Sequence, residues 1–150
     1  MTITYSLYLS TASTNNVQIN KQNLNNVTWT INWREIFGTQ KGECNIRLKL
    51  TTKSANNYTW ENNLGSVRCN FASGHQNSTN GFNVGSIQPY VDPVISTSAY
   101  LDCDTTKTKG LTMTIPTTNS NFNVMLLNSS ESLMTNITDY QLFLYFDFLE

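Results

Sequence analysis

The sequence predicts an all-β protein: an antiparallel β-sandwich, built as a single jelly roll of about eight to nine strands in one domain spanning residues 1–150. Apolar and polar residues alternate along most of the chain, which is the pattern of strands with one buried face. Clusters of Asn, Ser, Thr and Gly separate these alternating runs, and short strands between regular turn signals are typical of sandwiches and barrels. No segment carries helical spacing over three turns.

Nine segments carry the strand pattern. The clearest are 27–33, with Trp29 and Trp33 on its apolar face, and 44–51, in which Cys44, Ile46, Leu48 and Leu50 alternate with polar residues. Residues 33–37 (WREIF) have the spacing of a single helical turn between these two strands. The remaining strands are predicted at 2–9, 65–72, 81–88, 95–101, 111–115, 122–127 and 140–149.

The last predicted strand, YQLFLYFDFL at 140–149, is apolar on both faces. Its first face carries only Tyr, Leu and Phe, and its second carries Phe143, Tyr145 and Leu149 beside Gln141 and Asp147. A strand with one face in water should alternate cleanly, so we expect a second sheet, a loop or another protein chain to cover both faces.

Segment 122–127 is also apolar on both faces, because Met125 and Leu127 lie opposite Phe122, Val124 and Leu126. The candidate interface or packing residues are therefore those on the second faces of these two strands: Phe143, Tyr145, Leu149, Met125 and Leu127.

Charge is scarce and balanced. Charged residues make up 13% of the chain, about half the usual share, and the formal net charge is −1. The nine Lys and Arg residues are scattered singly, which argues against a nucleic-acid partner, since phosphate binding needs a basic patch. The polar residues are mostly uncharged, with 21 Asn and 35 Ser plus Thr. Nucleotide bias in an AT-rich genome explains that composition, and so does the depletion of charge at protein interfaces.

No catalytic, cofactor-binding or metal-binding site is predicted. The single histidine, His75, lies in a polar loop without a recognisable nucleophile motif. The three cysteines form an odd, widely spaced set that we interpret as free buried thiols, and Asp102 and Asp104 as a strand end running into a turn. Trp29 and Trp33 are expected in the core, whereas Tyr58 and Trp60 are the candidate exposed aromatic residues.

The N-terminal residues show no basic region followed by a long apolar run, so no signal peptide is expected. No run approaches the ~20 apolar residues of a membrane span. Together with the odd cysteine count, this predicts synthesis in a reducing compartment such as a host cytoplasm.

Several short patterns together resemble a known family: WTINW at 29–33, FG at 37–38, CNIRLKL at 44–50, NLG at 63–65, GFNVG at 81–85 and YQLFLYFD at 140–147. In layout the chain resembles the small single jelly-roll minor capsid proteins of large icosahedral double-stranded DNA viruses, of the chlorovirus and giant-virus kind. The resemblance implies a cement- or scaffolding-type subunit of the virion, in a homo- or hetero-oligomer whose partners are the major capsid protein and other capsid subunits. It brings no catalytic residues.

Two alternatives remain. The first is a non-enzymatic binding module, a lectin-like or receptor-binding sandwich that would use Tyr58 and Trp60, or a calcium site at Asp102 and Asp104. The second is an enzyme, which the composition disfavours because jelly-roll enzymes of the cupin kind need clustered histidines.

Overall fold

The computed structural model describes residues 2–12, 18–54, 65–70, 82–91, 99–107, 111–114, 121–135 and 137–149. Within these ranges the chain forms ten strands and one short helix, α1 (Trp33–Phe37). The strands are β1 (Thr2–Ser10), β2 (Gln18–Asn23), β3 (Asn26–Thr30), β4 (Glu43–Ser54), β5 (Gly65–Asn70), β6 (Phe82–Val91), β7 (Ala99–Asp104), β8 (Leu111–Thr114), β9 (Asn121–Leu127) and β10 (Gln141–Leu149).

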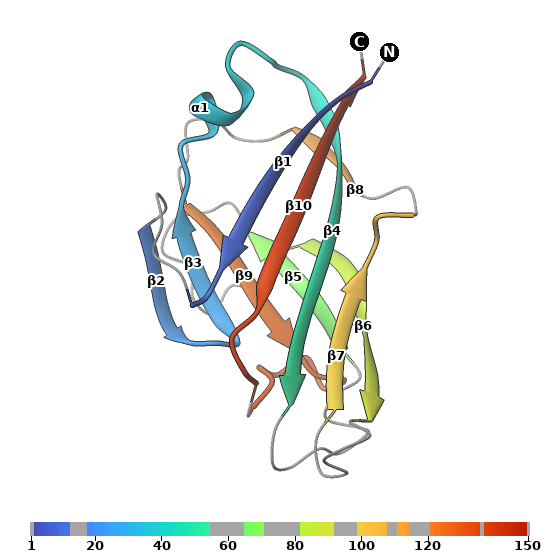
Figure 1. The fold of residues 1–150 in the computed structure, drawn as a ribbon. Coiled ribbons are helices and arrows are strands. Elements are labelled where there is room, and N and C mark those ends of the chain that lie inside the picture. Colours follow the sequence, from blue (N-terminus) through green and yellow to red (C-terminus); the bar gives the residue numbers. More distant parts are fainter. Residues whose placement is uncertain are drawn as a thin grey trace.

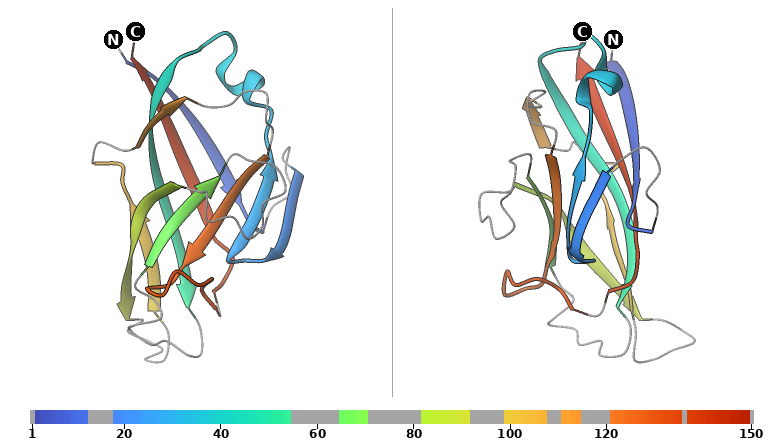
Figure 2. Two further views of the ribbon diagram at one scale, coloured as in Figure 1. Left: turned by 180° about the vertical axis from the view of Figure 1, so that it is seen from behind. Right: turned by 90° about the vertical axis from the view of Figure 1, so that its left-hand side faces the viewer.

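The strands form two antiparallel layers packed face to face (Figures 1 and 2). The front sheet has the order β1-β10-β4-β7, and β8 pairs with the first part of β4 beside it. The back sheet has the order β2-β3-β9-β5-β6. Strand β6 belongs to both sheets, because its first part, Phe82 to Ile87, pairs with β5 and its last part, Gln88 to Val91, pairs with β7. It therefore closes one side of the sandwich, as strands that switch sheets do at sandwich corners.

The strand order is that of a jelly roll. Four antiparallel pairs each join a strand of the first half of the chain to a strand of the second half: β1 with β10, β3 with β9, β4 with β7, and β5 with β6. In a jelly roll these paired strands are wound into two sheets, and here β10 also pairs with β4 in the front sheet and β9 with β5 in the back sheet. The antiparallel β-sandwich of the single jelly-roll type is thus confirmed, with β2 and β8 added to its eight strands.

The core lies between the inner faces of the two sheets. Trp29 of β3, Leu48 of β4, Val124 of β9 and Phe146 of β10 are all at most 1% exposed. Each alternates along its strand with residues of the other face, as the period of a strand requires. Helix α1 closes one end of this core, because the Phe37 ring lies 5.2 Å from the ring of Phe146.

The helical turn predicted at 33–37 is confirmed, but the strand predicted at 27–33 is too long at its C-terminal end. Strand β3 ends at Thr30, and Asn32 caps the helix by accepting a hydrogen bond from the backbone N–H of Glu35 at 3.4 Å. Gly38 ends the helix with a positive φ of 60°, a conformation that glycine adopts without strain. Trp29 and Trp33 both reach the core, as expected, although they come from different elements.

Candidate interaction surface

The outer face of the front sheet carries exposed hydrophobic side chains among polar and charged ones. Among the described residues, the large hydrophobic side chains that are exposed all lie on that face: Tyr8 (48% exposed), Tyr100 (42%), Phe143 (36%) and Leu149 (82%). They come from three strands that are distant in sequence, β1, β7 and β10. Scattered exposed apolar residues are normal, but a gathering on one sheet face is typical of an interaction surface.

An aromatic pair lies near one end of this outer face. Tyr8 and Phe143 are cross-strand neighbours in the β1–β10 ladder, and their ring centroids lie 5.0 Å apart. Lys49 of β4 is the neighbour of Phe143 on its other side. Aromatic cross-strand pairs contribute roughly 0.2–1 kcal/mol, so this pair mainly supplies apolar area to the surface.

A shallow hollow of about 600 Å³ lies beside the aromatic pair. Phe143 and Tyr145 supply its apolar wall, and the polar side is made by the residues Lys49, Thr51, Asp139 and Gln141. The Asp139 carboxylate is held in place by the Thr11 hydroxyl, which donates to it at 2.7 Å.

A second hollow, of about 690 Å³, lies at the opposite end of the same face. It is lined by Thr2, Glu43, Cys44, Asn45, Thr112, Asp147 and Leu149. The outer face is therefore uneven: exposed Leu149 stands beside one hollow, and the Tyr8–Phe143 pair stands beside the other.

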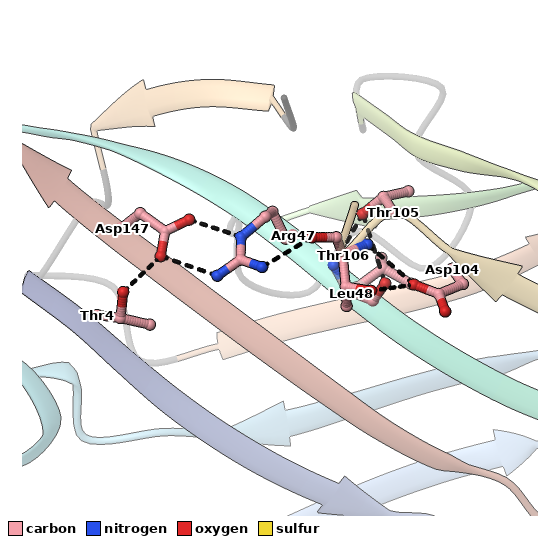
Figure 3. Close-up of polar contacts among 7 residues, drawn as sticks. All are labelled: Thr4, Arg47, Leu48, Asp104, Thr105, Thr106 and Asp147. Atoms are coloured by element: carbon pink, nitrogen blue, oxygen red, sulfur yellow. Dashed lines mark hydrogen bonds and ion pairs between the residues drawn. The ribbon is translucent and has the colours of Figure 1, made fainter. Parts of the chain in front are cut away.

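An ion pair links β4 and β10 on the outer face (Figure 3). Arg47 of β4 donates to both carboxylate oxygens of Asp147 on β10, from Nε at 2.6 Å and from a terminal nitrogen at 3.0 Å. The Thr4 hydroxyl donates to the same carboxylate at 2.7 Å, and Arg47 also donates to the carbonyl of Thr106 at 2.9 Å. These bonds tie β1, β10, β4 and the turn after β7 together.

The same bonds set the charge state of Asp147. The hydrogen bonds from Arg47, and then the one from Thr4, hold the pKa of the Asp147 carboxyl below its usual range, against the opposing effect of burial. The hydrogen bond to Asp147 likewise raises the pKa of Arg47. Both groups are charged at neutral pH, so the pair is a permanent structural element of this face.

The interface candidates named from the sequence fall in two places. Phe143, Tyr145 and Leu149 lie on the outer face of the front sheet, where Tyr145 is half-buried beneath the Arg47 guanidinium at 5.2 Å. Met125 and Leu127 lie on β9 in the back sheet and are each 4% exposed, so they are buried within this chain. Their neighbour Asn123 is buried too, and its amide donates to the Asn26 side chain at 2.8 Å.

Sequence reasoning did not identify Tyr8 and Tyr100 as members of this surface. Tyr8 lies on the Thr- and Ser-rich face of its strand. A large aromatic residue on an otherwise polar face was the sequence feature that could have identified it. Tyr100 lies on β7, which is described from Ala99 onward; residues 95–98 of the predicted strand lie outside the described residues. Tyr58, Trp60 and His75 lie outside the described residues.

The described residues contain no group of three or more His, Cys, Asp or Glu side chains placed to hold a metal ion. Asp104 ends β7 and accepts hydrogen bonds from the Thr106 hydroxyl and backbone N–H, which lower its pKa. The interpretation of Asp102 and Asp104 as a strand end running into a turn is confirmed.

All three cysteines are free and buried, as expected from the sequence. Burial raises the pKa of Cys44 to about 12, with a smaller effect from the charge of Asp147. Burial is also the main cause that raises the pKa of Cys103 to about 12 and that of Cys69 still higher. The thiolate is the nucleophilic form, so these thiols are unreactive at neutral pH.

In the described part of the chain, no helix is long and apolar enough to cross a membrane.

No family model matches the chain, and no curated protein matches it. Among solved structures, a chain described as "nora virus structure" is similar, with 7% sequence identity, a TM-score of 0.24, and coverage of 97% of this chain and 54% of that one. This chain thus spans about half the length of that chain. The jelly-roll assignment therefore rests on the strand pairing in this chain itself.

Proposed function

We propose that this protein is a structural subunit of a viral capsid, of the minor capsid type in an icosahedral virion. Its partners would be the major capsid protein and other capsid subunits. The observation that carries the proposal is the gathering of exposed Tyr8, Tyr100, Phe143 and Leu149 on one face of a jelly-roll sandwich. Jelly rolls are a common architecture of capsid domains, and the sequence resemblance to small capsid proteins agrees with it.

In such a role the protein works by burying surface. Aromatic residues are enriched at the centres of interfaces, whereas charged residues are depleted there. The outer face of the front sheet fits the aromatic part of that composition through Tyr8, Tyr100 and Phe143. It also carries charges: Arg47 and Asp147 neutralise each other, the Lys53 ammonium lies 5.5 Å from the centre of the Tyr100 ring, and Lys49 is the neighbour of Phe143. Capsid contacts are repeated by symmetry, so even a modest interface gives a strong assembly when it is multiplied.

The direct test is quantitative mass spectrometry of particles purified from the virus or organism that encodes the chain. We expect the protein at a fixed molar ratio to the major capsid protein, retained through density-gradient and salt washes. Particles that form normally and lack the protein would exclude a role in the virion.

A double substitution tests which face makes the contact. Changing Tyr8 and Phe143 together to serine is expected to reduce incorporation into particles by about 10-fold or more, since truncating central aromatic residues costs about 2 kcal/mol or more each at hot spots. The variant should keep the wild-type circular dichroism spectrum, because both side chains are exposed. Lys41→Ser, an exposed change in the turn after α1, is the matched control and should assemble normally. A double variant that is incorporated as efficiently as wild type would assign the contact to another face.

One observation favours a second candidate, a glycan-binding module. The hollow beside Phe143 combines aromatic rings with the side chains of Asp139 and Gln141, and sugars are bound by stacking and hydrogen bonding of this kind. A glycan array with and without calcium, followed by calorimetric titration of any hit against wild type and Phe143→Ser, tests it. Binding that Phe143→Ser weakens by about 10-fold, close to 1.4 kcal/mol, would support this candidate. An array without hits would exclude it.

A further inference from the structure

Strand β1 is an open edge of the front sheet. On one side it pairs with β10 through nine consecutive residues, from Thr2 opposite Leu149 to Ser10 opposite Gln141. On its other side, no described strand pairs with it. An edge of this kind presents a row of backbone N–H and C=O groups that can pair with another strand.

The other edges within the described residues carry protective features that β1 lacks. At the edge of the back sheet, β2 contains Lys21 and an irregular register between Lys21 and Asn23. Strand β8 is only four residues long. Strand β1 contains no charged residue and no proline, and its register is unbroken. Short length, lysine and bulges are the usual means of blocking edge-to-edge pairing, so β1 is the edge left open to it.

The inner face of β1 is also incompletely covered. Ile3, Tyr5 and Leu7 point toward the core but are half-buried, whereas Leu144 and Phe146, their neighbours on β10, are 0% exposed. One more strand beside β1 would cover these three side chains. The edge therefore offers both backbone hydrogen bonds and apolar area to a partner.

We propose that the partner is β1 of a second copy of this chain, paired antiparallel about a two-fold axis at Ser6. In an antiparallel pair, opposite residues point to the same face, and a two-fold axis at Ser6 is the arrangement that pairs all nine residues. Ile3 then lies opposite Leu9 and Tyr5 opposite Leu7 on the inner face. Such an interface is self-complementary, as a two-fold contact must be.

The outer face also fits this pairing. Thr2 lies opposite Ser10, Thr4 opposite Tyr8, and Ser6 opposite its own copy. No like charges meet, because β1 carries none. The two front sheets become one continuous eight-stranded sheet, and the Tyr8–Phe143 pairs of both copies lie on the same side of it. This inference stands independently of the capsid role.

Placing opposite charges at Ser6, on the proposed two-fold axis, tests the register of the β1–β1 pairing. Ser6 is exposed, so Ser6→Lys and Ser6→Glu should each fold, but each places two like charges together across the axis. We expect wild type to sediment as a dimer, and each variant alone to associate about 10-fold or more weakly. An equimolar mixture of the two variants should restore the dimer, because Lys then faces Glu. Thr2→Lys is the matched control: its lysine faces Ser10 and should leave the dimer intact.

A second measurement needs only the wild-type chain. Amide hydrogen exchange within β1 should accelerate by about 10-fold or more when the protein is diluted below its dimerisation range, whereas exchange in β4 should not change. Wild type that sediments as a monomer, or a mixture of variants that stays monomeric, would overturn self-pairing at Ser6. Protection of β1 that appears only with a different capsid protein would overturn it too and assign the edge to that partner.

Discussion

Replacing Phe146 with alanine is expected to lower the free energy of unfolding by about 3–5 kcal/mol, the usual cost of removing a buried phenylalanine ring. Phe146 is 0% exposed on the inner face of β10. Its ring packs edge-to-face against Phe37 at 5.2 Å and Trp33 at 5.8 Å, so alanine leaves a cavity bounded by α1 and by both neighbouring strands. Urea denaturation followed by tryptophan fluorescence measures the change, because Trp33 borders that cavity.

The same strand supplies the matched control. Phe143 loses the same ring in Phe143→Ala, but it lies on the outer face and is 36% exposed. We expect a cost below about 1 kcal/mol there, since surface changes away from special features are small. Equal losses in the two variants would mean that the outer face of β10 belongs to the domain's own core and is not a surface for partners.

Replacing Asp147 with asparagine is the second large effect, with an expected loss of about 1.5–3 kcal/mol at neutral pH, the range for hydrogen bonds to charged groups. The substitution removes the charge that accepts two bonds from Arg47 and one from Thr4, and it leaves the guanidinium partly buried without its carboxylate. Asp102→Asn is the control: that carboxylate accepts an exposed hydrogen bond from Thr51 at 3.1 Å, and its loss should cost less than about 1 kcal/mol.

The pH dependence of this effect has a definite sign. The pKa of Asp147 is lowered in the folded protein, so its contribution is complete above the ordinary carboxyl pKa of about 4 and is lost as the pH falls through the lowered value. The stability difference between wild type and Asp147→Asn should therefore be largest at neutral pH and shrink on acidification below about pH 4. A difference that stays constant as the pH falls well below about 4, through the lowered pKa, would show that the charge of Asp147 contributes nothing.

The fold class followed from the sequence because alternation survives wherever one face of a strand is buried. Strand β4 is the clearest case, since Ile46, Leu48 and Leu50 are at most 2% exposed and alternate with polar residues. Strand β2 was not predicted, because QINKQN carries a single apolar residue and belongs to an edge. The end of β3 was misplaced because Ile31 and Trp33 continue the alternation of buried apolar residues, although Asn32 caps a helix that begins at Trp33.

The candidate surface was only partly predictable. Phe143, Tyr145 and Leu149 were identified because they break the polar face of an alternating strand. Their neighbours were not, because the pairing of β1 with β10 joins opposite ends of the chain and nothing local specifies that Tyr8 meets Phe143. Apolarity alone also does not tell an outward face from an inward one. Met125 and Leu127 show the same pattern as Phe143 and are buried within the chain.

The central place of β10 in the front sheet bears on how the protein is made. Its two neighbours are β1 and β4, so this strand is synthesised after both of the strands between which it inserts. Until then β1 and β4 lack the strand that pairs with both of them. Pairings between such distant segments form slowly, and exposed strands invite aggregation meanwhile. We therefore expect the front sheet to stay incomplete, and open to aggregation, until β10 has been synthesised and has inserted between β1 and β4.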